Sequence, residues 1–259
     1  MFAVMQWYGF ETMQTLTALS ARTALFLDFD GTLVDIAQRP DAVIVSPKLI
    51  ASLQVLNDQL KGALAIISGR ELAGIDGFLA PLMLPAAGAH GAQMRYADGS
   101  ITRVTPPDLF LVSQAAHQLC RLHPTLLVEQ KEAAIAVHYR AAPELEELCL
   151  LTMTQAVSRS PGTALLRGKQ VIEVKPEGVN KGRAIAAFMA TAPFAGRIPM
   201  FAGDDTTDED GFAVVQQLGG YAMKIGDGPT QARHRCASPA ALRQWLQEAA
   251  ASLAQGVAA

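Results

Sequence analysis

Residues 24–33 read ALFLDFDGTL, a short apolar run that leads two aspartates into a glycine turn. Alternate residues of a strand point to the same side, so Asp28 and Asp30 should converge where the strand ends. Gly31 allows a tight turn and a close approach of the backbone to a ligand. Two carboxylates this close repel each other unless a cation neutralises them or one takes a proton. The stretch therefore predicts a Mg²⁺-dependent reaction in which one carboxylate attacks and the other transfers protons.

Apolar runs alternate with helical patterns on both sides of this stretch. Residues 63–67 and 198–202 are short apolar runs, and residues 221–225 are a further strand candidate; each is followed by a polar or glycine-containing turn. Pro47 can open a helix at its first turn, and leucines then recur at helical spacing through residues 49–60. This alternation predicts an α/β fold with a parallel sheet and helices on both faces.

The middle of the chain has a different pattern, in which candidate elements follow the order β-α-β-β-α-β-β. This order predicts a compact α+β insert over residues 96–176. The parallel-sheet core would then comprise residues 1–95 and 177–259. We expect hinges at the two crossings between these parts, near residues 95–99 and 176–179.

Composition limits the classes of partner. The 259 residues are 50% hydrophobic and 17% charged, as in a globular protein. With 21 basic and 24 acidic residues the net charge is −3, which gives no reason to expect nucleic acid or an anionic membrane as a partner. The three cysteines are far apart, without CxxC spacing, and fit a reducing compartment. The N-terminal stretch lacks a positively charged signal-peptide region, and no run reaches the ~20 apolar residues of a membrane span. We expect a cytoplasmic monomer.

Three further polar clusters should lie at the same sheet edge as the two aspartates, because ligands bind beyond the carboxyl ends of parallel strands. Ser68 and Gly69 follow the second apolar run, where the start of a helix offers backbone N–H groups to an anion. Lys181 opens a later helix and supplies a cation. The acidic run GDDTTDED, residues 203–210, supplies the oxygen ligands that Mg²⁺ prefers.

Each cluster alone has a simpler explanation. An Asp-x-Asp-Gly sequence occurs in ordinary turns, and a single lysine on a helix is usually solvated. Aspartate and glutamate also stabilise the first turn of a helix without binding anything. A functional site is favoured because all four clusters occur in order, each at the end of a strand-like run.

With these four motifs the chain resembles the haloacid-dehalogenase superfamily of phosphatases. Further segments, together with GDDTTDED, resemble the trehalose-6-phosphate phosphatases: AGAHGA at 87–92, VHYR at 137–140 and IEVKP at 172–176. The similarity covers about residues 22–248. It implies a Rossmann-like core, with helices on both faces of the parallel sheet, and an inserted α+β cap domain.

The resemblance also implies roles for the core residues. Asp28 would be the nucleophile and form an aspartyl-phosphate. Asp30 would protonate the departing sugar oxygen and then deprotonate the water that hydrolyses the intermediate. Ser68, with Gly69 beside it, would bind the phosphoryl oxygens, and Lys181 would offset their charge.

The implied cofactor is Mg²⁺. Its ligands would be Asp28, the backbone carbonyl of Asp30, and Asp204. Asp205 would orient these ligands and contact the substrate, and Asp208 is a further candidate for the same orienting role.

Substrate choice is expected in the insert. Glu129 and Lys131 share one face of an extended segment, and Arg140 and Glu173 lie in segments with similar alternation. Alternating charges also coat the solvated face of ordinary antiparallel strands, but the resemblance implies that these four side chains contact the sugar. For His90 two roles stay open: shaping its glycine-rich loop, or touching the substrate.

The implied activity is hydrolysis of trehalose 6-phosphate to trehalose and inorganic phosphate, the last step of trehalose biosynthesis. One alternative is a related phosphatase for another sugar phosphate, such as sucrose phosphate. A second is a phosphomutase with the same core motifs. A third, a non-catalytic sugar-phosphate sensor, is expected to have lost one of four residues that are all present here: Asp28, Asp30, Lys181 and Asp204.

Overall fold

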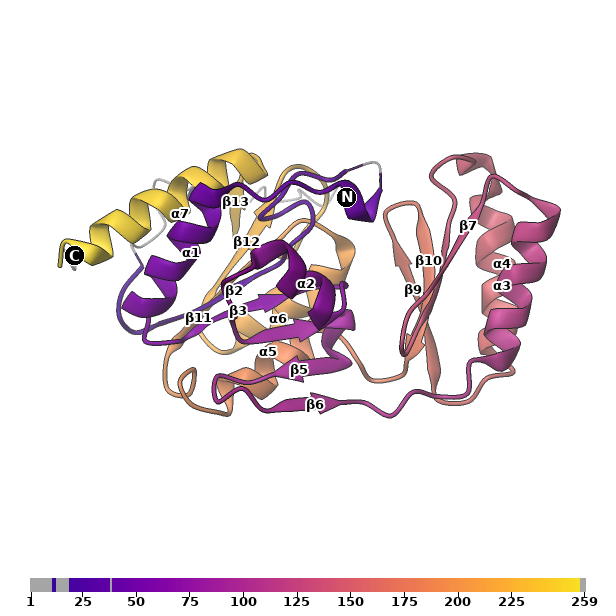
Figure 1. The fold of residues 1–259 in the computed structure, drawn as a ribbon, viewed down its shortest axis with the longest axis horizontal. Helices are drawn as coiled ribbons and strands as arrows, with labels where there is room; N and C mark the ends of the chain where they lie inside the picture. The colour runs from indigo at the N-terminus through magenta and orange to yellow at the C-terminus, as the bar shows by residue number, and fades with distance from the viewer. Residues whose placement is uncertain (1–10, 13–18, 38, 257–259) are drawn as a thin grey trace, which may run out of the picture.

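The chain forms two parts that lie side by side (Figure 1). A computed structural model describes residues 11–12, 19–37 and 39–256. Within these residues, the larger part is built on a nine-stranded sheet and the smaller part on a four-stranded sheet. The larger sheet contains, from edge to edge, β1 (Glu11–Thr12), β13 (His234–Cys236), β12 (Tyr221–Ile225), β11 (Ile198–Gly203), β2 (Thr23–Leu27), β3 (Leu64–Ile67), β4 (Ala86–Gly88), β5 (Gln93–Arg95) and β6 (Ile101–Arg103).

The strands from β1 to β4 are parallel to their neighbours, whereas β5 and β6 are antiparallel additions at one edge. Every residue of β2 and β3 is buried. Strands covered on both faces are apolar throughout and do not alternate, which is why residues 24–27 and 63–67 could be recognised as strands. The predicted parallel-sheet fold is confirmed.

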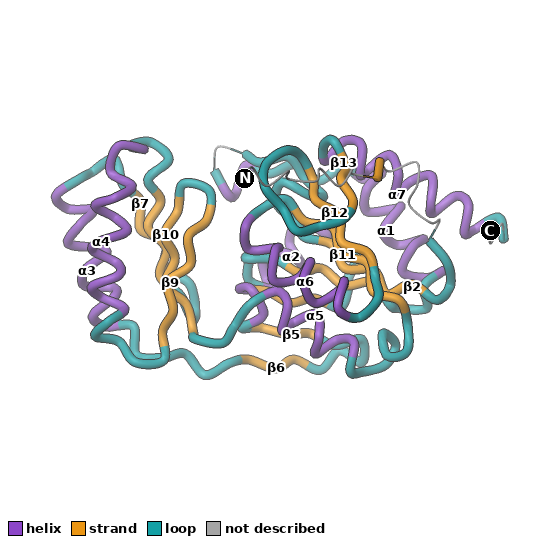
Figure 2. Tube along the Cα trace, turned by 180° about the vertical axis from the view of Figure 1, so that it is seen from behind, coloured by secondary structure: helices purple, strands orange, loops and turns teal. Residues whose placement is uncertain are grey.

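Helices cover both faces of this sheet (Figures 1 and 2). On one face α1 packs against α7, and on the other α5 packs against α6, while α2 adjoins β4 and β5. The bounds of these helices are α1 (Pro47–Gln59), α2 (Leu72–Leu79), α5 (Lys181–Met189), α6 (Glu209–Gln217) and α7 (Pro239–Ala254). This arrangement leaves the carboxyl edge of the parallel strands open toward the smaller part.

The smaller part is an antiparallel sheet with two helices on one face. Its strand order is β7 (Leu127–Gln130), β8 (Ile135–His138), β10 (Val171–Pro176) and β9 (Thr163–Gly168). The helices α3 (Phe110–Leu122) and α4 (Glu146–Val157) enclose a separate apolar core with this sheet. The uncovered face of the sheet is turned toward the larger part (Figures 1 and 2). We call the smaller part the cap and the larger part the core.

The predicted start of the insert at residue 96 is wrong in one respect. We expected the strand near Ile101 in the insert, but β6 pairs with β5 of the larger sheet through a turn at Gly99. All three β6 residues are exposed at the sheet edge. Such a strand carries no burial pattern that assigns it to a sheet. The chain therefore leaves the larger sheet after Arg103 and returns to it after β10.

No helix among the described residues is both long enough and apolar enough to cross a lipid bilayer.

Candidate active site

Asp28 lies at the carboxyl edge of the larger sheet. Its backbone N–H donates to the carbonyl of Ala202 on β11 at 2.9 Å, so Asp28 continues the pairing of β2 with β11. The residue is buried, with 4% of its surface exposed. Asp204 follows β11 directly and lies opposite. Gly31, with φ of +77°, lies against Asp204: a Cβ there would come within 2.3 Å of an Asp204 carboxylate oxygen. The glycine is required by both its backbone conformation and this close approach.

Lys181 joins two buried carboxylates. Its Nζ donates to Asp28 Oδ1 at 2.7 Å and to Asp208 Oδ1 at 2.6 Å, and the lysine is 3% exposed. The local reason for its position is the N-cap of α5, where the Asn180 side chain accepts the N–H of Arg183 at 2.8 Å. This cap makes Lys181 the first residue of the helix and directs it into the sheet edge. The structure thus brings together Asp28 and Lys181, 153 residues apart.

Asp28, Asp204 and Asp208 each place a carboxylate oxygen within 4.8 Å of the others, and all three are buried. Burial raises the pKa of Asp28 well above its ordinary value; Lys181 opposes this, whereas Asp208 and Asp204 add to it. Burial also raises the pKa of Asp204. Clustered, buried oxygen donors with an excess of negative charge fit a divalent cation of the Mg²⁺ type.

The members of this cluster are not equivalent. Both oxygens of Asp208 are engaged, one by Lys181 and the other by the backbone N–H of Asp205 at 2.9 Å. Asp205 and Asp208 form a reciprocal capping box at the turn before α6. Asp208 therefore fixes Lys181 and the Asp204 loop, which leaves Asp28 and Asp204 as the side chains suited to hold a cation. The expected contribution of Asp30 is a backbone carbonyl, which stays a prediction.

The side chain of Asp30 is held by Arg70. The guanidinium donates from Nε to Oδ2 at 2.6 Å and from Nη2 to Oδ1 at 2.7 Å, and it lies over the ring of Phe78 at 4.7 Å. Arg70 thus occupies both oxygens of the Asp30 carboxylate. A carboxylate paired in this way accepts hydrogen bonds, so Asp30 must exchange Arg70 for another partner before it can donate a proton.

Ser68 and Gly69 form the turn after β3 and line the same cleft. Ser68 is 1% exposed, and its Oγ accepts the backbone N–H of Arg70 at 3.1 Å. A Cβ on Gly69 would come within 2.7 Å of His90 Nε2. The turn is therefore packed between the core sheet and the AGAHGA loop, and it has no room for a larger residue.

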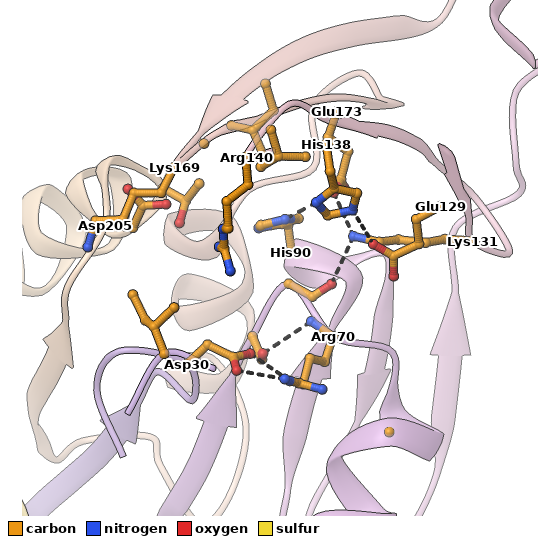
Figure 3. Close-up of a pocket in the computed structure, with 18 of the residues that line it drawn as sticks. Asp30, Arg70, His90, Glu129, Lys131, His138, Arg140, Lys169, Glu173 and Asp205 are labelled. Atoms are coloured by element: carbon orange, nitrogen blue, oxygen red, sulfur yellow. Dashed lines mark hydrogen bonds and ion pairs between the residues drawn. The ribbon is translucent and has the colours of Figure 1, made fainter. Parts of the chain in front are cut away.

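The cleft between core and cap has a volume of about 840 Å³, within the range of small-molecule sites. Figure 3 shows cap and core side chains facing one another across it. All the predicted substrate-binding residues line this cleft: Asp28, Asp30, Ser68, Gly69, Glu129, Lys131, Arg140, Glu173, Lys181 and Asp205. Asp204 lines it as well.

The cap side chains form an ordered row. Lys131 Nζ donates to Glu173 Oε2 at 2.6 Å, and the burial that lowers its pKa is outweighed by Glu173 and Glu129, so the pKa of Lys131 is raised. Glu129 Oε2 lies 2.8 Å from His138 Nε2, a contact that lowers the pKa of Glu129. Arg140 donates to the carbonyl of Ala37 in the core at 2.9 Å. Acidic and basic side chains thus alternate along the cap side of the cleft.

Sequence reasoning missed three partners in the cleft. Lys169, in the β9–β10 turn of the cap, lies 2.7 Å from Asp204 Oδ2 and so reaches the carboxylate cluster of the core. Arg70 and His138 hold Asp30 and Glu129. His138 stood inside the VHYR segment and Arg70 directly follows Gly69, yet nothing in the sequence says which carboxylate each would meet. Lys169 had only its place in a predicted hairpin turn as a signal.

A buried aspartate–lysine cluster at the carboxyl edge of a parallel sheet, facing an inserted α+β cap, is the arrangement expected from the resemblance to the haloacid-dehalogenase superfamily. The family model for trehalose-phosphatase matches residues 26–242. The chain therefore belongs to the trehalose-phosphatase family.

Individual relatives agree with this assignment. The trehalose-6-phosphate phosphatase of Escherichia coli K12 is 44% identical over 248 residues, which cover 95% of this chain and 93% of the relative. A probable trehalose-phosphate phosphatase of Sinorhizobium fredii is 43% identical over 224 residues, or 82% of each chain. Among solved structures, the C-terminal domain of the C. albicans trehalose-6-phosphate phosphatase superposes with a TM-score of 0.81 at 24% identity, covering 90% of this chain and 93% of that one.

Proposed function

We propose that this chain hydrolyses trehalose 6-phosphate to trehalose and inorganic phosphate. The observation that supports this most is a single cleft that joins the Asp28–Lys181–Asp204 cluster of the core to the Glu129–Lys131–Glu173 row of the cap. The first group suits a phosphoryl group, and the second offers paired donors and acceptors to sugar hydroxyls. Membership of the trehalose-phosphatase family favours this substrate over other sugar phosphates.

The chemistry divides into two displacements at phosphorus. The Asp28 carboxylate attacks, the bond from phosphorus to the sugar oxygen breaks, and Asp30 gives that oxygen a proton. Asp30 then takes a proton from a water molecule, whose oxygen attacks phosphorus and releases Asp28 and inorganic phosphate. Lys181 and Ser68 hold the phosphoryl oxygens during both steps, because this reaction depends mainly on positioning and charge neutralisation.

We also propose Mg²⁺ as the cofactor, held by Asp28 and Asp204 with the backbone carbonyl of Asp30. When bound, it would offset the negative charge of the phosphoryl oxygens. The all-oxygen donor set supports this choice. Arg70 and Lys169 would hold the carboxylates of Asp30 and Asp204 until substrate and cation take their places.

Mg²⁺ should stabilise the fold through Asp204. At 100 times its Kd it is expected to add ~2.7 kcal/mol to the free energy of unfolding, or roughly 5 to 10 °C in Tm for a chain of this size. Asp204→Asn should remove most of this increase, because the cluster loses a charged ligand. Thermal unfolding with and without Mg²⁺ measures it. The control is Glu248→Gln, on the exposed face of α7, which should keep the full increase.

The substrate assignment is tested by phosphate release from trehalose 6-phosphate, sucrose 6-phosphate, glucose 6-phosphate and p-nitrophenyl phosphate. We expect trehalose 6-phosphate to have the highest kcat/KM and to need Mg²⁺. A preference for another sugar phosphate would keep the core chemistry and refute the assignment of the cap. Rearrangement of a substrate without release of phosphate would identify a mutase, and the lack of either reaction would favour a sensor.

The remaining organisation is proposed on the same basis. We assign substrate recognition to a cap that spans residues 104–176, with the rest of the chain as the catalytic core. We further propose a monomer that works in the cytoplasm. The free state of Cys120, Cys149 and Cys236 supports a reducing compartment.

A further inference from the structure

His90 occupies an unusual backbone position between the core and the cap. Ala89, His90 and Gly91 all have positive φ, of +48°, +58° and +106°. The loop is held by two hydrogen bonds to the turn after β3: Ala89 N–H to the carbonyl of Arg70 at 2.7 Å, and His90 N–H to that of Ser68 at 2.9 Å. A left-handed conformation at a non-glycine residue persists only where the surroundings enforce it. The loop therefore presents the His90 side chain in a fixed direction.

That direction is toward the cap. His90 Nε2 lies 3.6 Å from Glu173 Oε1 on β10, and the two side chains are only 10% and 6% exposed. The other oxygen of Glu173 accepts from Lys131 at 2.6 Å, and Lys131 Nζ lies 3.5 Å from the carbonyl of Gly69. Figure 3 shows the His90 ring from the core beside this pair from the cap. Glu173 is thus enclosed by Lys131 on one side and by His90 on the other.

The surroundings of the imidazole favour its neutral form. Burial lowers the pKa of His90 well below its ordinary value, and the cations Lys181, Lys131 and Lys175 add to this. Glu173 is the carboxylate that lies against the ring, with its Oε1 at 3.6 Å from Nε2. A neutral ring fills the space beside Glu173 without competing with Lys131 for its charge.

We propose that His90 is a positioning residue for substrate recognition, which holds the Glu173 carboxylate and its Lys131 partner in the orientation that meets the sugar. His90 belongs to the core and Glu173 to the cap, so this support exists only while the two parts are closed on each other. The catalytic cluster binds the phosphate at one end of the cleft. At the other end, where the sugar binds, His90 supports Glu173 only when the cap is closed on the core. This inference rests on the proposed function, because it assumes a sugar at Glu173.

The test uses His90→Asn, since asparagine tolerates the left-handed conformation better than other side chains but is too short to contact Glu173. We expect kcat/KM for trehalose 6-phosphate to fall about tenfold, mainly through a higher KM. This is the size of effect expected when one interaction between neighbouring side chains is lost. For p-nitrophenyl phosphate, which lacks the sugar, the loss should be less than about threefold. The double variant His90→Asn with Glu173→Gln should be no worse than Glu173→Gln alone.

The matched control is His117→Asn, at an exposed position of α3, which should change neither substrate's kinetics. Equal losses for both substrates would overturn the inference, as would additive effects of the two cleft variants or unchanged kinetics in His90→Asn. If the wild type prefers another sugar phosphate, the proposed function fails, and the same comparison is then made with that sugar. A mere folding defect would lower both activities together and appear as a lower Tm.

Discussion

Replacing Asp28 with asparagine is expected to lower kcat for trehalose 6-phosphate by about 10⁴-fold or more, the scale for loss of a nucleophile. The amide is too weak a nucleophile to form the acyl-phosphate bond, so the first displacement stops. The fold should survive, because asparagine has the same shape and its Oδ1 can still accept from Lys181. Phosphate release at saturating substrate measures the effect, with Tm as the check on folding.

The control for this variant is Asp98→Asn in the exposed turn between β5 and β6. It makes the same chemical change far from the cleft and should retain full activity. If Asp28→Asn kept more than a tenth of the wild-type rate, another group would have to be the nucleophile. Asp204 is the next candidate, because it is a buried carboxylate of the same cluster.

Replacing Lys181 with methionine is expected to destabilise the protein by about 3 to 5 kcal/mol, as when one partner of a buried ion pair is removed. Methionine keeps most of the volume, so the effect reports charge and not a cavity. Asp28 and Asp208 would lose the cation that they share in a buried site. Thermal unfolding should show Tm lower by roughly 10 °C, and activity should also be lost, because Lys181 contacts the nucleophile.

The stability defect of this variant should depend on pH. Burial already raises the pKa of Asp28 in the wild type, and Lys181 works against that increase. Without Lys181 the folded-state pKa of Asp28 should rise further above its unfolded value. A group with a raised pKa stabilises the fold at low pH, and this is lost as pH rises through the folded pKa. The difference in Tm from wild type should therefore be smaller near pH 5 than near pH 8.

Lys169→Met provides the contrast. Its side chain is 55% exposed and contacts one carboxylate, Asp204. Ion pairs of this kind contribute ~0 to 1 kcal/mol, so its Tm should lie within a few degrees of wild type. A similar loss of stability in both lysine variants would show that burial of the Lys181 pair is not the cause.

The parts of the fold that could be predicted are those that depend on the pattern of neighbouring residues in the sequence. β2 and β3 could be recognised because strands buried on both faces are continuously apolar. β4, β5 and β13 are three residues each and were not assigned as strands, since so short a run shows no periodicity. β6 was assigned to the wrong sheet, because an exposed edge strand has no burial pattern to place it.

In the site, likewise, the motif residues could be predicted from the sequence but their interaction partners could not. Asp28, Ser68 and Asp204 could be placed together because each directly follows a strand of the parallel sheet, whose carboxyl ends meet at one edge. The partners could not be found, because they depend on the distance and direction between side chains on different elements. Arg70 reaches Asp30 across 40 positions, and Lys131 reaches Glu173 across 42. His138 could have been paired with Glu129 only once the register of β7 and β8 was known.

The strand order has a consequence for synthesis on the ribosome. β2 lies between β3 and β11, and β11 is made about 170 residues after β2. While the chain emerges, β2 has one pairing edge without its neighbour, whereas residues 110–176 contain all the strands and helices of the cap. We therefore expect the cap to fold first, whereas the core sheet stays incomplete until β11 emerges. During this time the unpaired edge of β2 makes the nascent chain prone to aggregation. A nascent chain that has released residues up to 176 from the exit tunnel, but not β11, should carry a folded cap on a core that still lacks β11.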